Sequence, residues 1–284
     1  MSAASASDIP FIHKIFHPTD FSPDSEEAFA HALAICLFRR GELTLLHAGE
    51  EYLDGDEWQK FPAVRGTLER WKLLPKGSSR AAVFRELGIR VNKISAVGDP
   101  LAASMEYLAD DPADLMVLAT EGREGLPRWI RRSTAERLAR HTGIKTLFVP
   151  HGARGFVNLD GELELRRILV PIAATPDPHP ALTYAARSTL LAGGEPVDLI
   201  ALHVGEDLPK FELPEPTGPR CAWRTLRAEG DPEDEIVRFA KEEQIDLVFM
   251  ATHGPDSLRD VLGGSLTERV LRRVSCPLCA VPVG

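Results

Sequence analysis

The chain has 284 residues, 44% of them hydrophobic and 26% charged, which is the composition of a globular protein of one large or two smaller domains. Its 42 acidic residues outnumber its 33 lysines and arginines, and this excess argues against a general nucleic-acid-binding protein, which needs a basic surface. Four cysteines, no apolar run of about 18 residues and no signal-peptide pattern predict a cytoplasmic protein without a membrane segment.

The first 150 residues predict strands that alternate with helices. Ser22 is expected to cap a helix that has Pro23 in its first turn and ends at Gly41. Asp99 and Pro100 are expected to begin a later helix in the same way. Apolar segments mark the expected strands, which are 15–18, 43–46, 91–96, 115–119 and 145–149.

The second half of the chain repeats the first. Gly98-Asp99-Pro100 recurs as Gly230-Asp231-Pro232, 132 positions later. At the same offset, Ser133 matches Ser265, Glu136-Arg137 matches Glu268-Arg269, and Val149-Pro150 matches Val281-Pro282. Agreement without a gap over some fifty residues indicates an internal duplication.

The repeat predicts two domains, residues 1–152 and 153–284. The first carries an insertion at about 50–87, which contains Trp58 and Trp71, and the second has a proline-rich stretch over 208–219. Alternating strands and helices predict an α/β fold in which each domain is a mainly parallel five-stranded sheet with helices on both faces. In such sheets a ligand binds outside the carboxyl ends of the strands, where the strand order reverses.

The motif with the clearest chemical meaning follows the fourth strand of the second copy. Ala251-Thr252-His253-Gly254 is followed by nine residues and then by Gly264-Ser265-Leu266, where a helix is expected to start. The unpaired N–H groups of that helix start, the glycines and the Ser265 hydroxyl predict a phosphate site without a lysine. The loop is neither a Walker A motif nor a dinucleotide-binding G-x-G-x-x-G motif, because neither string occurs.

This spacing, together with a first-strand V-P-x-D-like segment, a second-strand L-H-V and the G-D-P turn, resembles the universal stress protein family. The resemblance covers nearly the whole chain, twice, and implies two tandem flavodoxin-like or Rossmann-like domains, a subgroup of the family binding ATP. Carried over residue by residue, it places the phosphates at Ala251, Gly254, Gly264, Ser265 and Leu266, with Thr252 and His253 shaping the loop. It places the adenosine part near Pro171, Ala173 and Val204.

The two copies depart from the family pattern in different ways. In the second copy Ala251 replaces a glycine and Ala173 replaces the first-strand aspartate, so that weakened nucleotide binding is expected. The first copy keeps Asp20 but has Glu121 and Arg132 in its loop, and we expect its site to be blocked. Two interpretations of Arg132 stay open, a cap that pairs with Asp20 and a solvated side chain.

Charge is divided unevenly between the copies. Residues 1–152 carry a net charge of −2 and residues 153–284 a net charge of −7. The half expected to bind an anionic nucleotide is therefore the more acidic one, so its phosphate site should depend on backbone N–H groups, and on a cation such as Mg²⁺ if one is bound, rather than on Lys or Arg.

The family resemblance implies a stress-related protein, and the motif then predicts a sensor or binding module with at most slow ATP hydrolysis. It offers no catalytic residues and no metal-binding cluster, and Cys276 and Cys279 are expected to be core residues rather than a redox pair. The alternative is a nucleotide-free scaffold with two degenerate sites, whose insertion around Trp58 and Trp71 binds a partner. The short apolar last strands predict that the two copies dock face to face as an intramolecular pseudo-dimer, and a further homodimer is compatible with this.

Overall fold

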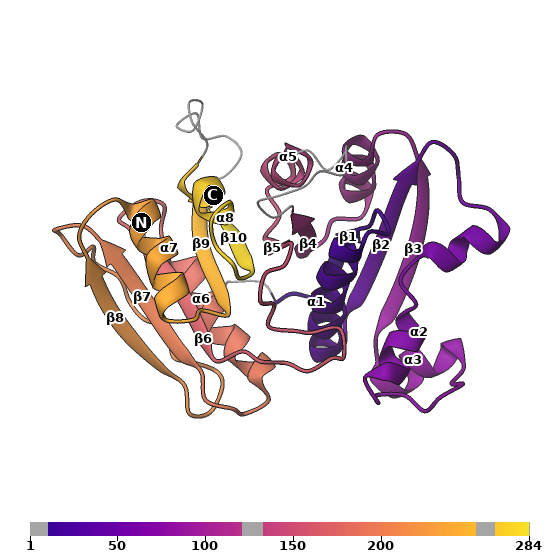
Figure 1. Cartoon of the computed structure of the whole chain (residues 1–284), viewed down its shortest axis with the longest axis horizontal. Helices are drawn as coiled ribbons and strands as arrows, with labels where there is room; N and C mark the ends of the chain where they lie inside the picture. Colours follow the sequence, from indigo (N-terminus) through magenta and orange to yellow (C-terminus); the bar gives the residue numbers. More distant parts are fainter. Residues whose placement is uncertain (1–10, 121–132, 254–264, 284) are drawn as a thin grey trace.

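A single ten-stranded sheet runs through the computed structural model, which describes residues 11–120, 133–253 and 265–283. Its order among the described residues is β3-β2-β1-β4-β5-β10-β9-β6-β7-β8, so each half of the chain contributes five strands in the same order (Figure 1). The strands are β1 Lys14–Pro18, β2 Glu42–Gly49, β3 Arg90–Val97, β4 Leu115–Thr120, β5 Thr146–Pro150, β6 Arg167–Ile172, β7 Asp198–Val204, β8 Ala222–Ala228, β9 Leu247–His253 and β10 Leu278–Val283.

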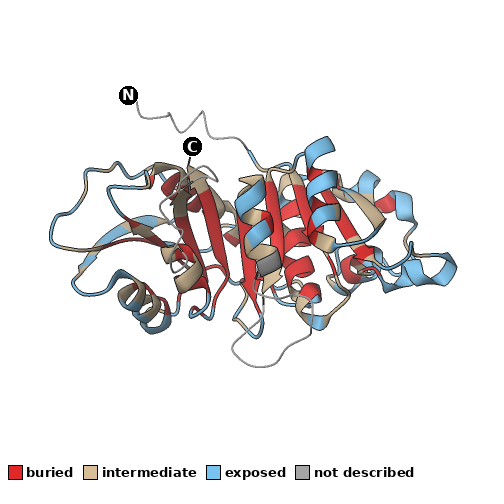
Figure 2. Ribbon diagram, turned by 90° about the horizontal axis from the view of Figure 1, so that it is seen from above, coloured by how far each residue is buried: buried red, intermediate tan, exposed pale blue. Residues whose placement is uncertain are grey.

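Helices cover both faces of this sheet, as the alternating sequence pattern predicts. One face packs against α1 (Pro23–Arg39), α2 (Val64–Arg70), α3 (Arg80–Leu87) and α6 (His179–Ser188). The other packs against α4 (Pro100–Asp110), α5 (Ser133–Thr142), α7 (Pro232–Glu242) and α8 (Leu266–Leu271). The described residues also form two short 3₁₀ helices, η2 (Gly55–Lys60) and η3 (Thr189–Ala192). The buried residues lie mainly on the strands and on the inner sides of the helices (Figure 2).

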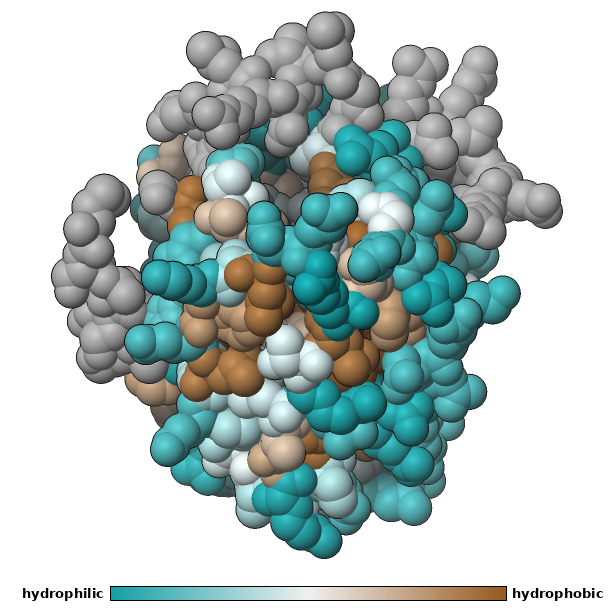
Figure 3. Space-filling view, turned by 90° about the vertical axis from the view of Figure 1, so that its left-hand side faces the viewer, coloured by the Kyte–Doolittle hydropathy of each residue, from teal (hydrophilic) through white to brown (hydrophobic). Residues whose placement is uncertain are grey.

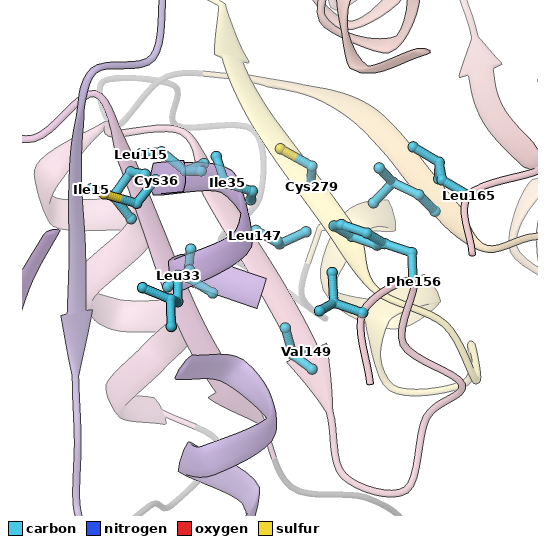
Figure 4. Close-up of a cluster of buried hydrophobic side chains, with 14 of the residues drawn as sticks. Ile15, Leu33, Ile35, Cys36, Leu115, Leu147, Val149, Phe156, Leu165 and Cys279 are labelled. Atoms are coloured by element: carbon cyan, nitrogen blue, oxygen red, sulfur yellow. The ribbon is translucent and has the colours of Figure 1, made fainter. Parts of the chain in front are cut away.

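The two halves join edge to edge through their last strands. We expected face-to-face docking, but β5 and β10 pair antiparallel, with Leu147 opposite Cys279, while the strands within each half pair in parallel. Each half ends its sheet with an apolar strand, and pairing two such edges satisfies backbone groups that would otherwise be unpaired. The buried cluster around Leu147 and Cys279 also includes Ile35 of α1 and Phe156 of the linker, residues 151–166 between β5 and β6, so the core continues across the junction (Figure 4).

Local sequence signals account for most helix ends. Ser22 accepts a hydrogen bond from the Ser25 N–H at the start of α1, and Asp99 does the same for the start of α4. Gly41 differs from the prediction, because Arg40 is the left-handed residue that ends α1. A Cβ at Gly41 would lie 2.3 Å from the carbonyl oxygen of His13, so glycine is needed there for the close approach of two backbone segments.

The insertion of the first half is helical and packs against the linker between the halves. It contains η2, α2 and α3, which lie at the β3 end of the molecule (Figure 1). The Trp71 indole Nε1 donates a hydrogen bond of 2.9 Å to the carbonyl oxygen of Leu159 in the linker. Trp58 stacks on Phe61 and remains 39% exposed. Of the two tryptophans, Trp71 therefore contacts the linker, whereas Trp58 packs within the insertion.

Candidate functional site

A cavity of about 660 Å³ lies at the carboxyl ends of β6, β7 and β9 and beside the start of α8. Eight of the ten predicted site residues line it, and they are Pro171, Ala173, Val204, Ala251, Thr252, His253, Ser265 and Leu266. The other two, Gly254 and Gly264, lie outside the described residues. The volume falls within the ~300–1,000 Å³ typical of small-molecule sites.

The sheet order explains why residues so far apart in sequence meet here. β6 lies between β7 and β9, all three strands are parallel, and their carboxyl ends therefore meet at one edge. Val204 ends β7 and Ala173 follows β6 directly, while Ala251 to His253 end β9. From β6 the chain continues to β7 on one side, and the later strand β9 is added on the other side. This is the reversal of strand order at which such sheets bind ligands.

The start of α8 differs from the predicted row of unpaired donors. The Ser265 N–H donates to Glu268 Oε2 at 3.2 Å, and the Ser265 hydroxyl oxygen accepts from the Glu268 N–H at 3.2 Å. This reciprocal capping arrangement satisfies two groups that were expected to be free. The Ser265 hydroxyl also lines the cavity, and because it donates to no acceptor among the described residues it can donate to a ligand.

The first half of the chain supplies part of the cavity wall, which the sequence did not predict. The residues of this wall come from α5, β5 and the turn between them, and they are Glu136, Ala139, Arg140, Gly143, Ile144, Thr146 and Phe148. Because β5 and β10 are antiparallel, the end of α5 lies beside the carboxyl ends of the second half's strands. Only the pairing of the two sheet edges could have indicated this contribution, since these residues form no motif of their own.

Two ion pairs cross between the halves at this wall. The Arg140 guanidinium donates to Glu268 Oε1, and Arg272 Nη2 lies 3.5 Å from Glu136 Oε2. Arg140 and Arg272 occupy equivalent positions in the two copies, as do Glu136 and Glu268. The same pair is thus formed twice, each half giving an arginine to the other half's glutamate, as in an isologous interface.

The equivalent position in the first half is much smaller. A cavity of about 70 Å³ lies there, lined among others by Pro18, Asp20, Ala48 and Ala119, the counterparts of the predicted residues of the second half. The Asp20 carboxylate accepts hydrogen bonds from the N–H and the hydroxyl of Ser22. Glu121 and Arg132 lie outside the described residues, and so does the cap hypothesis for Arg132.

The donor groups of the large cavity suit an anionic organic ligand better than a protein-held metal. Most of the wall is apolar, and the ionisable and hydroxyl side chains among the described residues that line it are serines, threonines, one arginine, one histidine (His253) and two glutamates. Its two carboxylates, Glu136 and Glu268, both form ion pairs with arginines. No group of three potential metal ligands occurs in the part of the chain that the structure describes.

Cys276, Cys279 and His17 are buried in the core away from the cavity. Cys276 and Cys279 are buried, and burial raises the pKa of each thiol to about 12, so neither is a thiolate near neutral pH. His17 is also buried, and its Nδ1 lies 2.8 Å from the carbonyl oxygen of Val117. The prediction that the two cysteines are core residues is confirmed.

Comparison with known proteins identifies the family. The sequence model of the universal stress protein family matches residues 12–150 and 215–282. Curated relatives include the Methanocaldococcus jannaschii universal stress proteins MJ0577, 38% identical over 52 residues, and MJ0531, 43% identical over 57 residues. These matches cover 18% and 20% of this chain and 32% and 34% of the relatives, so they span about a third of each relative's length.

Solved structures share the fold over nearly the whole chain. A universal stress protein of Archaeoglobus fulgidus matches with a TM-score of 0.61 at 19% identity and covers 95% of this chain and 98% of its own. The functionally unknown protein PA1789 of Pseudomonas aeruginosa matches with a TM-score of 0.60 at 14% identity and covers 95% of this chain and 92% of its own.

Within the described residues, none of the helices has the length and apolar character needed to cross a membrane.

Proposed function

The chain belongs to the universal stress protein family, and from this premise we propose that its second half binds ATP or a related adenine nucleotide. The proposal rests on the 660 Å³ cavity, because eight of the residues predicted from the sequence line it together. Its apolar strand residues suit a base and a sugar. The hydroxyl of Ser265 and the loop that contains Gly254 and Gly264 would hold the phosphates.

The difference between the halves supports one site per chain. The cavity of the first half has about a tenth of the volume of the other, roughly 70 against 660 Å³, and falls well below the size of ordinary ligand sites. We propose that the first half has lost nucleotide binding and serves as a structural partner in an intramolecular pseudo-dimer. A further homodimer and a cytoplasmic location belong to the same proposal.

The proposed role is that of a sensor or binding module rather than an efficient enzyme. The described cavity residues include no lysine and no free pair of carboxylates of the kind that rapid phosphoryl transfer uses to hold Mg²⁺ and orient a nucleophile. Mg²⁺ would enter bound to the phosphates of ATP, and hydrolysis would be slow at most. The stress-response role follows from the family alone.

A solved universal stress protein crystallised in complex with cAMP matches 49% of this chain at 20% identity with a TM-score of 0.31. The bound cAMP concerns that protein, and the proposal for this chain depends on its own cavity and motif.

Isothermal titration calorimetry of the full chain with ATP and Mg²⁺ tests the proposal. We expect one nucleotide per chain, and no heat of binding at millimolar ATP would contradict it. Mass spectrometry of the protein as purified separates it from the scaffold alternative, because a retained nucleotide supports the first and contradicts the second. Trp71 already contacts the linker, which leaves the more exposed Trp58 as the insertion's candidate for partner binding.

A further inference from the structure

We infer that Arg140, a residue of the first half, binds the anionic part of the ligand in the second half's cavity. The inference rests on the proposed nucleotide function and deepens it, because it makes the site a composite of both halves. It also changes the expectation from the sequence, in which the acidic half was to hold an anion without any arginine or lysine.

Position is the first argument. Arg140 lies near the end of α5 and lines the cavity together with Ala251, Ser265 and Glu268 of the second half. Its guanidinium bonds to Glu268, the residue whose other carboxylate oxygen accepts the N–H of Ser265. The guanidinium is therefore held beside the hydroxyl that the motif assigns to the phosphates.

Charge is the second argument. Arg140 is the only arginine or lysine among the described residues that line the cavity, and residues 153–284 carry a net charge of −7. An anion entering there meets the Glu268 carboxylate, which would repel it unless a cation lies between them. Arg140 is such a cation, and it comes from the half whose own net charge is only −2.

Hydrogen-bonding capacity is the third argument. A guanidinium has five N–H donors in a planar fork that matches the oxygens of a phosphate. In the structure one of its nitrogens, Nη2, donates to Glu268, and the side chain remains 53% exposed. Arg140 can thus keep its bond to Glu268 and donate to a phosphate at the same time, without leaving a carboxylate unpaired.

Arg272, the counterpart of Arg140 in the second half, does not line either cavity. Arg272 forms the equivalent ion pair with Glu136, but it lines neither the large cavity nor the small one. The repeated ion pair therefore stabilises the junction twice, but only the copy with Arg140 faces a cavity large enough for a nucleotide. This difference supplies a matched control.

The test is calorimetry of the full chain with ATP, AMP and adenosine for four proteins, the wild type, Arg140→Gln, Arg272→Gln and Arg137→Gln. Arg137 is exposed on the same helix and does not line the cavity, so its variant controls for net charge. We expect Arg140→Gln to lower the affinity for ATP about 10-fold or more, as loss of a charged hydrogen bond does, and to leave adenosine binding unchanged. Arg140→Lys should restore part of the loss.

Arg272→Gln, which removes the same kind of ion pair from the junction, should shift the melting temperature as much as Arg140→Gln but lower the ATP affinity less, because it removes a charge partner of the wall carboxylate Glu136 and no donor to the phosphate. Equal ATP affinities for the wild type and Arg140→Gln would overturn the inference and leave the proposed function intact. An equal loss for ATP and adenosine would also overturn it, because the role of Arg140 would then be structural. Absence of nucleotide binding by the wild type would instead contradict the proposed function.

Discussion

His31 is a buried histidine whose neutral form joins the first half to the linker. Its side chain is 1% exposed, its Nδ1 lies 2.8 Å from the carbonyl oxygen of Glu27, and its Nε2 accepts the N–H of Val157 at 3.4 Å. Burial lowers its pKa from 6.5 to about 4. A proton on Nε2 would point at the N–H of Val157, so the charged ring does not suit this site.

This histidine predicts a loss of stability on acidification. Above pH 6.5 the ring is neutral in both folded and unfolded chains, so its contribution is fully present. As the pH falls from 6.5 to about 4, the unfolded chain binds a proton that the folded chain excludes, and the difference reaches about 3 kcal/mol. Urea titrations at pH 7.5 and pH 4 measure how far the free energy of unfolding falls on acidification. This fall should be about 3 kcal/mol smaller for His31→Gln than for the wild type. Equal losses would contradict the prediction, because His17 and the carboxyl groups titrate in both proteins.

At the scale of elements, the contact between α2 and the linker fixes the path between the halves. A Cβ at Gly161 would lie 2.3 Å from Trp71 Cγ, so the linker backbone passes directly against the indole ring. Arg70 Nε also donates to the carbonyl oxygen of Leu159 at 3.1 Å. The insertion thus has a structural role in addition to any surface that it offers.

Removal of this contact should loosen the linker. We expect Trp71→Ala to lower the free energy of unfolding by about 2 kcal/mol, less than a fully buried tryptophan because part of the ring is exposed, and to speed proteolysis within residues 153–166. Trp58→Ala is the matched control, since Trp58 stacks on Phe61 and no described contact joins it to the linker. Limited proteolysis followed by mass spectrometry locates the cuts. Equal cleavage of the two variants would contradict a role for Trp71 in the linker.

The same scale shows what sequence patterns can and cannot reveal. Apolar runs and caps such as Ser22 and Asp99 are local, so they identify the strands and helix starts of both halves. The wall formed by α5 depends on the pairing of β5 with β10, a contact between segments about 130 residues apart. Likewise, the spacing of the loop motif identifies the cavity residues but not the side-chain bonds of Ser265, which depend on the capping glutamate.

For the whole molecule, the continuous sheet joins the two halves through shared buried clusters and a shared cavity wall. Both buried clusters contain residues from β5 and β10, and the cavity has walls from both halves. By contrast, the outer end at β8 has hydrophobic side chains grouped in the middle of the face, with hydrophilic ones between and around them (Figure 3). Leu208 and Leu213 of the proline-rich stretch are also exposed. Ligand binding should therefore protect residues on both sides of the β5–β10 junction more than residues at the β8 end.

Hydrogen exchange can detect this coupling. At a nucleotide concentration 100 times the dissociation constant, binding stabilises the folded state by about 2.7 kcal/mol, which slows exchange through global opening about 100-fold. Amides in the last turn of α5 should gain further protection from local opening, because Ala139 and Arg140 line the cavity, whereas those of α4 in the same half should show the global effect alone. Protection confined to the second half, in a protein that calorimetry has shown to bind nucleotide, would contradict the shared wall. It would mean that the two halves open independently despite their continuous sheet.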